Sequence, residues 1–324
     1  HVRTQQPTAA SLQRWEAGWG EAGVASLGLV AGGALGEDSA WRIAAQRYRA
    51  DGSRYNQFVD RDDTNGLSEN TLRWRSTHRL ASQWQADWSV LAVDQNNGFD
   101  AFSIDNSRRT RSDDPGRDRQ RSRGASLELV REGAVEFRSL TALVDADILY
   151  SFDGDWGFDP DYDFTSRFLR DRRTMSQDLR WLSEDDGWIV GLYGLDIRET
   201  NDQLDLYGGE VYRALKSDYQ ARHAAVYGSY ERDITSRWVF TLGARLEHRA
   251  SRYTDPDGTD VGPDEMMWGV NLSLGYLIDS NRRLYLSLAR GYKAGGFNIG
   301  AAIPGERREL SDELLNSIEL GYKA

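Results

Sequence analysis

The sequence predicts an all-β fold, an antiparallel transmembrane β-barrel, and three observations carry this prediction. Short segments alternate between apolar and polar residues, as strands do when one face meets lipid and the other meets water. The links between these segments alternate between short turns and long polar stretches. Finally, no stretch reaches the roughly 18 consecutive apolar residues that a membrane-spanning helix needs.

The strands can be followed along the chain by writing out both faces of each segment. In 41–46, 72–79 and 84–90, apolar residues occupy one face and mostly polar residues the other. The pattern is clearer in 238–247, 268–278 and 284–289, where the second face holds small or polar residues. Several apolar faces end in aromatic residues, which is typical of the interfacial girdles of membrane barrels. Counted this way, the chain has about fourteen strands, the first near 12–20 and the last near 314–324.

The connections support the same fold and give it an orientation. Short links are expected near 36–39, 81–83, 131–134, 184–187, 232–237 and 279–283. Long polar links are expected near 49–70, 94–123, 145–174, 198–217, 249–265 and 291–312. Outer-membrane barrels have short periplasmic turns and long extracellular loops, so this asymmetry predicts which end of the barrel faces the cell exterior.

Composition excludes several classes of function. The 324 residues include no Cys, which rules out disulfides, thiolate metal sites and Cys nucleophiles. A net charge of −11 argues against a nucleic-acid partner. The first ten residues, HVRTQQPTAA, have neither the charged nor the apolar region of an export signal, so we expect a mature, trimmed or fragmentary chain.

The sequence offers no positive support for an enzyme or for a resident cofactor. It has no GxSxG elbow and no phosphate-binding GxxxxGK[ST] motif. Its four histidines are scattered without HxH or HExxH spacing, which indicates neither a metal site nor a catalytic triad. They are His1, His78, His223 and His248.

An acidic stretch, 145–164, holds seven Asp and is the strongest candidate for cation binding. Carboxylate oxygens suit hard cations, but neither this stretch nor the DPDGTD sequence that begins at Asp255 has EF-hand spacing. We therefore favour a solvated acidic loop, bridged by divalent ions to lipopolysaccharide phosphates, over a dedicated metal site.

Six charged residues are expected on the lumenal face of the barrel by the alternation. They are Arg73, Arg75, Arg79, Arg245, Glu247 and Glu319. The simplest interpretation is that a lumenal wall is polar as a matter of course. The alternative is a specific contact with something held inside the barrel.

Two linked motifs resemble a known family. SLARGYKAGGFN, residues 287–298, is followed by SDELLNSIELGYKA, in which Glu313 leads into an E-x-G-x-K strand formed by Glu319, Gly321 and Lys323. Together they resemble the mid-barrel signature of TonB-dependent outer-membrane receptors. Upstream elements agree in order, namely RADGSRYN, NNGFDAF from Asn96, SQDLRWLSEDDGWIVGLYG from Ser176 and WVFTLGARLEHR from Trp238. The resemblance covers nearly the whole chain.

The resemblance implies a 22-stranded barrel whose lumen is filled by an N-terminal plug domain. On this expectation, residues 1–11 are a lead-in from a missing plug, with Pro7 near the junction, and residues 12–324 are a partial barrel. About eight strands would be missing, and Ala324 is not the terminal aromatic expected of such a barrel. An open sheet of fourteen strands has two unpaired edges that lipid does not tolerate, so we expect a fragment.

The resemblance also implies a location, partners and a function. A receptor of this family lies in the outer membrane of a Gram-negative bacterium, among lipid and lipopolysaccharide. It imports a scarce solute, most often a ferric siderophore, when the TonB complex acts on its plug. The lumenal residues would then contact the plug or line the substrate route, but the ligand-binding residues are not identifiable from the sequence.

Two alternatives from other classes remain open at this point. The first is a complete fourteen-stranded passive porin or channel without energy coupling, which requires the first strand to pair with the last. The second is a soluble β-rich glycan-binding protein.

The GYKAGGFN run also has two interpretations. Either Gly291, Gly295 and Gly296 let the strand bend as it leaves the membrane, with Tyr292 and Phe297 in the rim, or the run contacts a ligand. We favour the structural interpretation, in which the glycines shape the exit of the strand.

Overall fold

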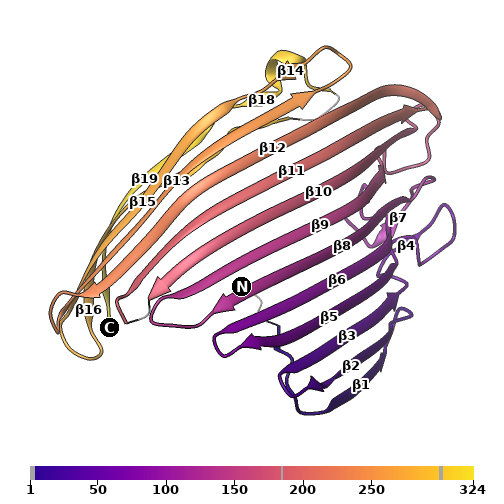
Figure 1. Cartoon of the computed structure of the whole chain (residues 1–324). Coiled ribbons are helices and arrows are strands. Elements are labelled where there is room, and N and C mark those ends of the chain that lie inside the picture. Colours follow the sequence, from indigo (N-terminus) through magenta and orange to yellow (C-terminus); the bar gives the residue numbers. More distant parts are fainter. Residues whose placement is uncertain (1–3, 184, 299–301) are drawn as a thin grey trace.

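The computed structural model describes residues 4–183, 185–298 and 302–324. One antiparallel sheet dominates it, and successive strands lie side by side in chain order (Figure 1). The strands are β1 (Leu12–Trp19), β2 (Ala25–Gly36), β3 (Ser39–Ala50), β5 (Leu67–Ala81), β6 (Trp84–Phe99), β8 (Gly116–Arg131), β9 (Glu136–Asp153), β10 (Phe164–Ser183), β11 (Trp188–Tyr207), β12 (Glu210–Asp233), β13 (Trp238–Thr254), β15 (Asp264–Leu277), β16 (Arg283–Lys293) and β19 (Glu313–Lys323). The predicted all-β, antiparallel fold is thus confirmed.

The remaining elements are small and lie in the connections. β14 (Asp260–Val261) pairs with β13, β4 (Tyr55–Asn56) pairs in parallel with β7 (Arg109–Thr110), and β17 (Gly296–Phe297) pairs with β18 (Glu309–Leu310). One 3-10 turn, η1, spans Gly305–Arg307. Among the described residues, no helix has the length and apolar character to cross a membrane.

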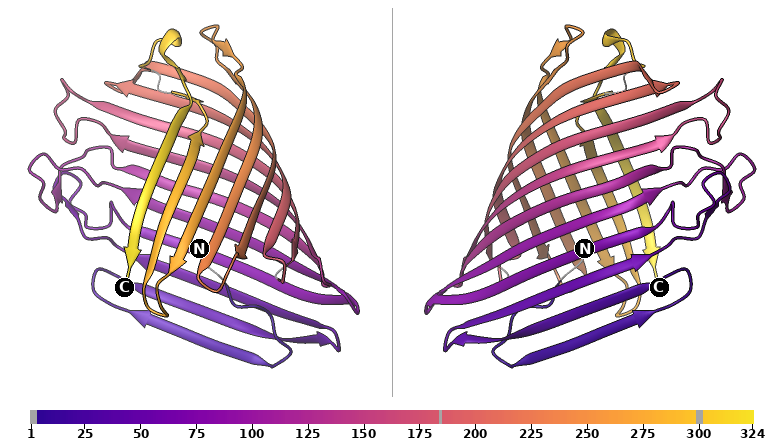
Figure 2. Two further views of the ribbon diagram at one scale, coloured as in Figure 1. Left: turned by 90° about the vertical axis from the view of Figure 1, so that its left-hand side faces the viewer. Right: turned by 90° about the vertical axis from the view of Figure 1, so that its right-hand side faces the viewer.

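The sheet curves round like part of a barrel wall, but it is not closed (Figure 2). Within the described chain, β1 pairs only with β2 and β19 pairs only with β16. The porin alternative required these first and last strands to pair with each other, so its structural prediction is wrong.

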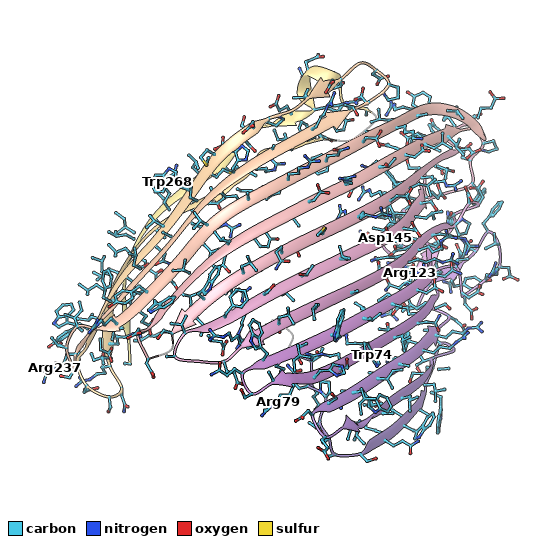
Figure 3. All side chains as sticks on the ribbon, in the orientation of Figure 1. Trp74, Arg79, Arg123, Asp145, Arg237 and Trp268 are labelled. Atoms are coloured by element: carbon cyan, nitrogen blue, oxygen red, sulfur yellow. The ribbon has the colours of Figure 1, made fainter. Side chains whose placement is uncertain are left out.

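The two faces of the sheet differ as the alternation predicts. The convex face is apolar and open, with Trp268 at 48% and Ile318 at 79% exposure, and Trp268 projects outward from it (Figure 3). Near the short turns its aromatic rings gather in the pairs Trp84–Phe137, Phe137–Trp181 and Trp238–Tyr276, with centroids 6.4, 5.3 and 4.8 Å apart. Apolar side chains left open to this degree suit a lipid environment, and the rings suit its interface.

The concave face, here called the lumenal face, carries tyrosine rings that lie over glycines on neighbouring strands. Tyr227 of β12 is the direct cross-strand partner of Gly191 in β11, and Tyr285 of β16 is the partner of Gly321 in β19. In both pairs a Cβ added to the glycine would overlap the tyrosine ring. The glycine therefore provides the space into which the aromatic ring folds, a device that stabilises glycine positions in sheets.

The turns lie where the sequence predicts them, but one long loop does not exist. We expected a loop over 198–217, whereas β11 continues to Tyr207 and β12 begins at Glu210. Only Gly208 and Gly209 link them, with φ of 57° and 76°, the positive values that a tight hairpin turn requires. The loops expected over 94–123 and 145–174 shrink similarly to 100–115 and 154–163.

The physical reason is the same in each case. Above the membrane both faces of a strand meet water, so the apolar alternation disappears while the backbone ladder continues. Arg198 still pairs with Arg173 and Gln220 in register, although none of them is apolar. The sequence pattern therefore marked the membrane boundary rather than the end of the strands.

Candidate functional site

A network of charged and tyrosine side chains crosses the lumenal face over five strands. On β10 and β12, the Tyr227 hydroxyl donates to Asp178 Oδ1 at 2.7 Å, while Arg180 Nε donates to the same hydroxyl at 3.0 Å. The Arg245 guanidinium of β13 lies over the rings of Tyr193 and Tyr227, 5.3 and 5.7 Å from their centroids. This arrangement links the β10–β12 part of the wall to β13 through one arginine.

Glu247 is the centre of the second half of this network. It accepts hydrogen bonds from Arg245 Nε at 2.8 Å and from the Tyr292 hydroxyl at 2.8 Å. His223 Nδ1 lies 2.7 Å from its other carboxylate oxygen. Glu247 is buried, so these contacts compensate a charge that water reaches poorly. The sequence placed Arg245 and Glu247 on this face correctly, but it did not connect them with Tyr292.

The other predicted lumenal residues lie apart from this network. Arg75 Nη1 donates to Thr4 Oγ1 at 3.0 Å, so the N-terminal segment lies against the lumenal wall. Arg79 lines a hollow with Pro7, and Glu319 accepts from Tyr285. Arg73 pairs in register with Ala44 and lines another hollow with Arg14 and Glu16. These residues thus form separate contacts rather than one site.

The histidines are distributed over different elements. His78 lies between the hydroxyls of Ser39 and Ser76, and His248 Nε2 lies 2.5 Å from Asp264. His223 belongs to the lumenal network. His1 lies outside the described residues.

Three long extracellular loops are called here the first (51–66), the second (100–115) and the third (154–163), and buried polar residues join the first to the second. Asp100 Oδ2 accepts hydrogen bonds from Asn56 Nδ2 at 2.9 Å, Thr64 Oγ1 at 2.7 Å and Thr110 Oγ1 at 2.6 Å. Asn56 Nδ2 also donates to the carbonyl of Ser112 at 2.8 Å, and all five residues are buried. One carboxylate therefore holds the first loop on the second.

Stacked aromatic rings join the third loop to the other two. Phe58 of the first loop stacks on Phe158 of the third, and Phe102 of the second stacks on Trp156, with centroids 5.2 Å apart in both pairs. The backbone N–H of Asp113 donates to the carbonyl of Gly157 at 3.1 Å. Because every ring in these pairs also remains exposed, the loops present an aromatic surface to the cell exterior.

Asp153, at the extracellular end of β9, lies in an electrostatically unfavourable place. Burial raises the pKa of its carboxyl group to about 7, and the neighbouring Asp155 adds to this effect. Burial likewise raises the pKa of Asp113, with Asp155 and Asp163 contributing. The predicted acidic stretch therefore includes a carboxyl group that the fold holds away from water.

The last extracellular loop closes on a buried ion pair. Arg308, only 3% exposed, pairs with Asp255 and donates from Nη1 to the Tyr253 hydroxyl at 2.9 Å and from Nε to the carbonyl of Ile303 at 3.1 Å. Phe297 stacks on Tyr253 with the centroids 5.4 Å apart. The loop after β16 is thereby fixed to the end of β13.

Arg290, just before the GYKAGGFN run, and Tyr292, within the run, lie on opposite sides of the sheet. Arg290 lies over the Trp268 ring at 3.8 Å on the convex side, whereas Tyr292 reaches Glu247 on the lumenal side. Gly269 lies beneath the Tyr292 ring, since an added Cβ would approach that ring within 3.3 Å. We expected Tyr292 and Phe297 in the rim; Phe297 packs there on Tyr253, at the extracellular end of β13, whereas Tyr292 points to the lumenal side.

A curved antiparallel sheet with an apolar outer face, a polar lumenal face and packed extracellular loops defines the class of protein, which is an outer-membrane β-barrel protein. Residues 29–324 match the family described as TonB dependent receptor-like, beta-barrel. The chain therefore belongs to the TonB-dependent receptor β-barrel family, whose members are outer-membrane transporters and not enzymes. This membership also removes the soluble glycan-binding alternative.

Solved structures of siderophore receptors share this fold. The ferric yersiniabactin uptake receptor FyuA from Yersinia pestis is similar over 98% of this chain and 52% of its own, with a TM-score of 0.81 and 18% identity. The siderophore receptor PiuA from Acinetobacter baumannii matches over 98% of this chain and 55% of its own, with a TM-score of 0.75 and 11% identity. For the ferripyoverdine receptor of Pseudomonas aeruginosa, the coverages are 98% and 46%, the TM-score is 0.70 and the identity is 12%.

The chain thus spans about half the length of the receptors that it resembles. A comparison with curated protein sequences finds no match.

Proposed function

We propose that this chain forms the barrel part of a receptor that takes up a ferric siderophore across the outer membrane. The observation that carries the proposal is the similarity of the fold, over 98% of the chain, to receptors for ferric yersiniabactin and other siderophores. At 18% identity or less this similarity concerns the fold, so the cargo needs an argument of its own.

The extracellular loops provide that argument through their chemistry. Phe58, Phe158 and Trp156 are exposed on the packed loops. Arg108 and Arg109 lie on the second loop, where neither forms an ion pair with a described residue. Aromatic faces and arginines on the same set of packed loops favour a flat anionic ligand, because rings stack on rings and guanidinium groups attract negative charge. Iron chelates built on catecholate or phenolate groups have both properties.

We further propose that residues 1–11 connect to a plug domain, that residues 12–324 form part of a larger barrel domain, and that transport depends on the TonB complex. The contact of Arg75 with Thr4 supports this, since it directs the N-terminal segment into the lumen where a plug would lie. The unpaired outer edges of β1 and β19 support additional strands, because backbone groups in lipid need hydrogen-bond partners.

The test is uptake of radioactive iron by cells that carry the full-length receptor gene and lack their other siderophore receptors. Cells receive ⁵⁵Fe bound to catecholate, phenolate or hydroxamate siderophores, in strains with and without TonB. We expect TonB-dependent uptake of an aromatic chelate. Uptake of cobalamin, haem or a glycan without iron uptake would contradict the proposed ferric siderophore. Equal uptake with and without TonB would contradict the proposed dependence on the TonB complex.

A further inference from the structure

Three carboxylates from two extracellular loops converge on one point. Asp113 comes from the second loop, Asp153 from the end of β9 and Asp155 from the third loop. One oxygen of each lies within 4.8 Å of the others, a spacing that allows all three to bind one cation. The acidic stretch in the sequence contains two of them, but Asp113 is supplied by a different loop and is brought in by the fold.

The negative charge at this point has no counterpart among the basic residues that the structure describes. Some other carboxylates of the extracellular region pair with arginine, such as Asp63 with Arg61 and Asp260 with Arg252, both at 2.7 Å. In the described part of the chain, none of the three converging carboxylates forms an ion pair with Lys, Arg or His. Leaving carboxylates together without a cation is unfavourable, more so where burial weakens their contact with water.

Two buried oxygen atoms at this point also lack hydrogen bonds. Asp153 is 6% exposed; its Oδ1 accepts from the backbone N–H groups of Asp155 and Trp156, but its Oδ2 has no partner among the described residues. Ser112 is 3% exposed, and its Oγ faces the Asp153 carboxylate without a hydrogen bond of good geometry. Buried oxygens are rarely left unpaired, so an unpaired hydroxyl next to an unpaired carboxylate oxygen indicates a missing ligand.

Oxygen donors of this kind select the class of ion. Carboxylates and a hydroxyl are hard ligands that suit Ca²⁺ or Mg²⁺, and no His or Cys among the described residues joins the cluster to favour a transition metal. Calcium tolerates irregular geometry and higher coordination numbers, whereas Mg²⁺ requires a compact octahedron. Donors that arrive from two separate loops fit the more permissive ion.

We propose that Asp113, Asp153 and Asp155, together with the Ser112 hydroxyl, bind one calcium ion that ties the second extracellular loop to the third. Calcium replaces the missing positive charge and gives both unpaired oxygens a partner. Sites exposed to the millimolar calcium outside a cell bind with dissociation constants of about 0.1 to 1 mM, and we expect this range. Because the ion joins loops that already pack through Phe102 and Trp156, its binding orders a preformed contact rather than creating one.

Terbium luminescence tests the site directly. Tb³⁺ replaces Ca²⁺ at oxygen sites, and Trp156 can sensitise it, since its backbone N–H already contacts Asp153 at 3.1 Å. The full-length receptor in detergent micelles is titrated with Tb³⁺ and then with CaCl₂ or MgCl₂. We expect saturable emission that CaCl₂ displaces at about millimolar concentration and that MgCl₂ displaces less well. Trp156→Phe should remove the emission while calcium binding by calorimetry persists.

Matched variants separate a site from diffuse attraction by an acidic loop. Asp113→Asn and Asp153→Asn should each weaken Tb³⁺ and Ca²⁺ binding by about tenfold or more, because each removes a charged ligand. Asp161 is exposed in the third loop, so Asp161→Asn should change Tb³⁺ and Ca²⁺ binding less than twofold. Equal losses in Asp161→Asn and Asp113→Asn would overturn the proposal in favour of a solvated acidic loop.

Proteolysis provides a second readout that does not depend on luminescence. Arg108, Arg109 and Arg111 lie exposed in the second loop, next to Asp113. We expect 2 mM CaCl₂ to slow tryptic cleavage there in the wild type but not in Asp113→Asn, whose folding is verified by heat-modifiable mobility on gels. Absence of calcium-displaceable emission, with cleavage independent of calcium, would show that the carboxyl groups share protons instead and would refute the site.

Discussion

Neutralising Arg308 should release the last extracellular loop. Arg308 is 3% exposed and pairs with Asp255, whose side chain is inaccessible to solvent. Arg308→Met keeps the length of the side chain but leaves the Asp255 carboxylate buried without its cation. Breaking a buried ion pair by removing one partner costs about 3–5 kcal/mol. Because this pair lies in a loop surrounded by water, we take the lower end, about 3 kcal/mol.

Hydrogen exchange measures this cost locally. A loss of about 3 kcal/mol corresponds to about a hundredfold faster exchange, at about 1.4 kcal/mol per factor of ten. We expect that acceleration for amides of 295–298 and 302–312 in the full-length receptor in nanodiscs. Arg307→Met is the control, since Arg307 is exposed beside it and should change exchange less than twofold. Removing both charges, in Arg308→Met with Asp255→Asn, should restore much of the protection.

The reasoning has a clear point of failure. An acceleration below about fivefold in Arg308→Met, or the same acceleration in Arg307→Met, would show that packing of Phe297 on Tyr253 holds the loop without the ion pair.

Three further predictions concern pH, the lumenal face and the lipid face. Burial opposes ionisation of Asp255, but hydrogen bonds from its turn and the nearby arginine outweigh this and hold its pKa below the ordinary value. Hydrogen-exchange protection of the last extracellular loop should therefore be constant from pH 8 to 5 and fall below about pH 4. Gly191→Ala forces the Tyr227 ring away from the Asp178 carboxylate and should lower the free energy of unfolding, measured with denaturant, by about 1 kcal/mol. Gly194→Ala, with open space at its Cβ, should not lower it. Leu286→Arg on the lipid face should cost about 2–4 kcal/mol in vesicle refolding, and lumenal Ser287→Arg should cost less than about 1 kcal/mol.

Each of these has an outcome that contradicts it. Loss of loop protection between pH 7 and 5 would assign the titration to another group. Equal destabilisation by both alanine variants would remove the special role of the tyrosine pair, and equal cost of both arginine variants would contradict the assignment of the two faces.

The sequence predicts this fold well because lipid imposes a pattern that water does not. From Trp238 onward, alternate residues of β13 had to be apolar, and this alone fixed the strand, its faces and the turns beside it. The pattern failed where that constraint ends. Nothing in 198–217 distinguishes a paired strand from a loop, since the ladder there is held by backbone hydrogen bonds that any residue can make.

The sites were less predictable than the fold because they depend on distant parts of the chain. Arg245 and Glu247 could be placed on the lumenal face by alternation, but Tyr292 reaches them from β16, across β15, where Gly269 lies beneath its ring. Asp113 was missed for the same reason, since its partners at Asp153 and Asp155 lie beyond an intervening hairpin.

The glycine–tyrosine pairs have a consequence for how the barrel assembles. Tyr227 fits only against Gly191, and a slip of two residues between β11 and β12 would set its ring against Ile189 or Tyr193. Such a slip keeps every apolar side chain in lipid, so the membrane itself would not reject it. Steric overlap at one aromatic ring can do so, and each glycine–tyrosine pair therefore favours the correct strand register over a register shifted by two residues.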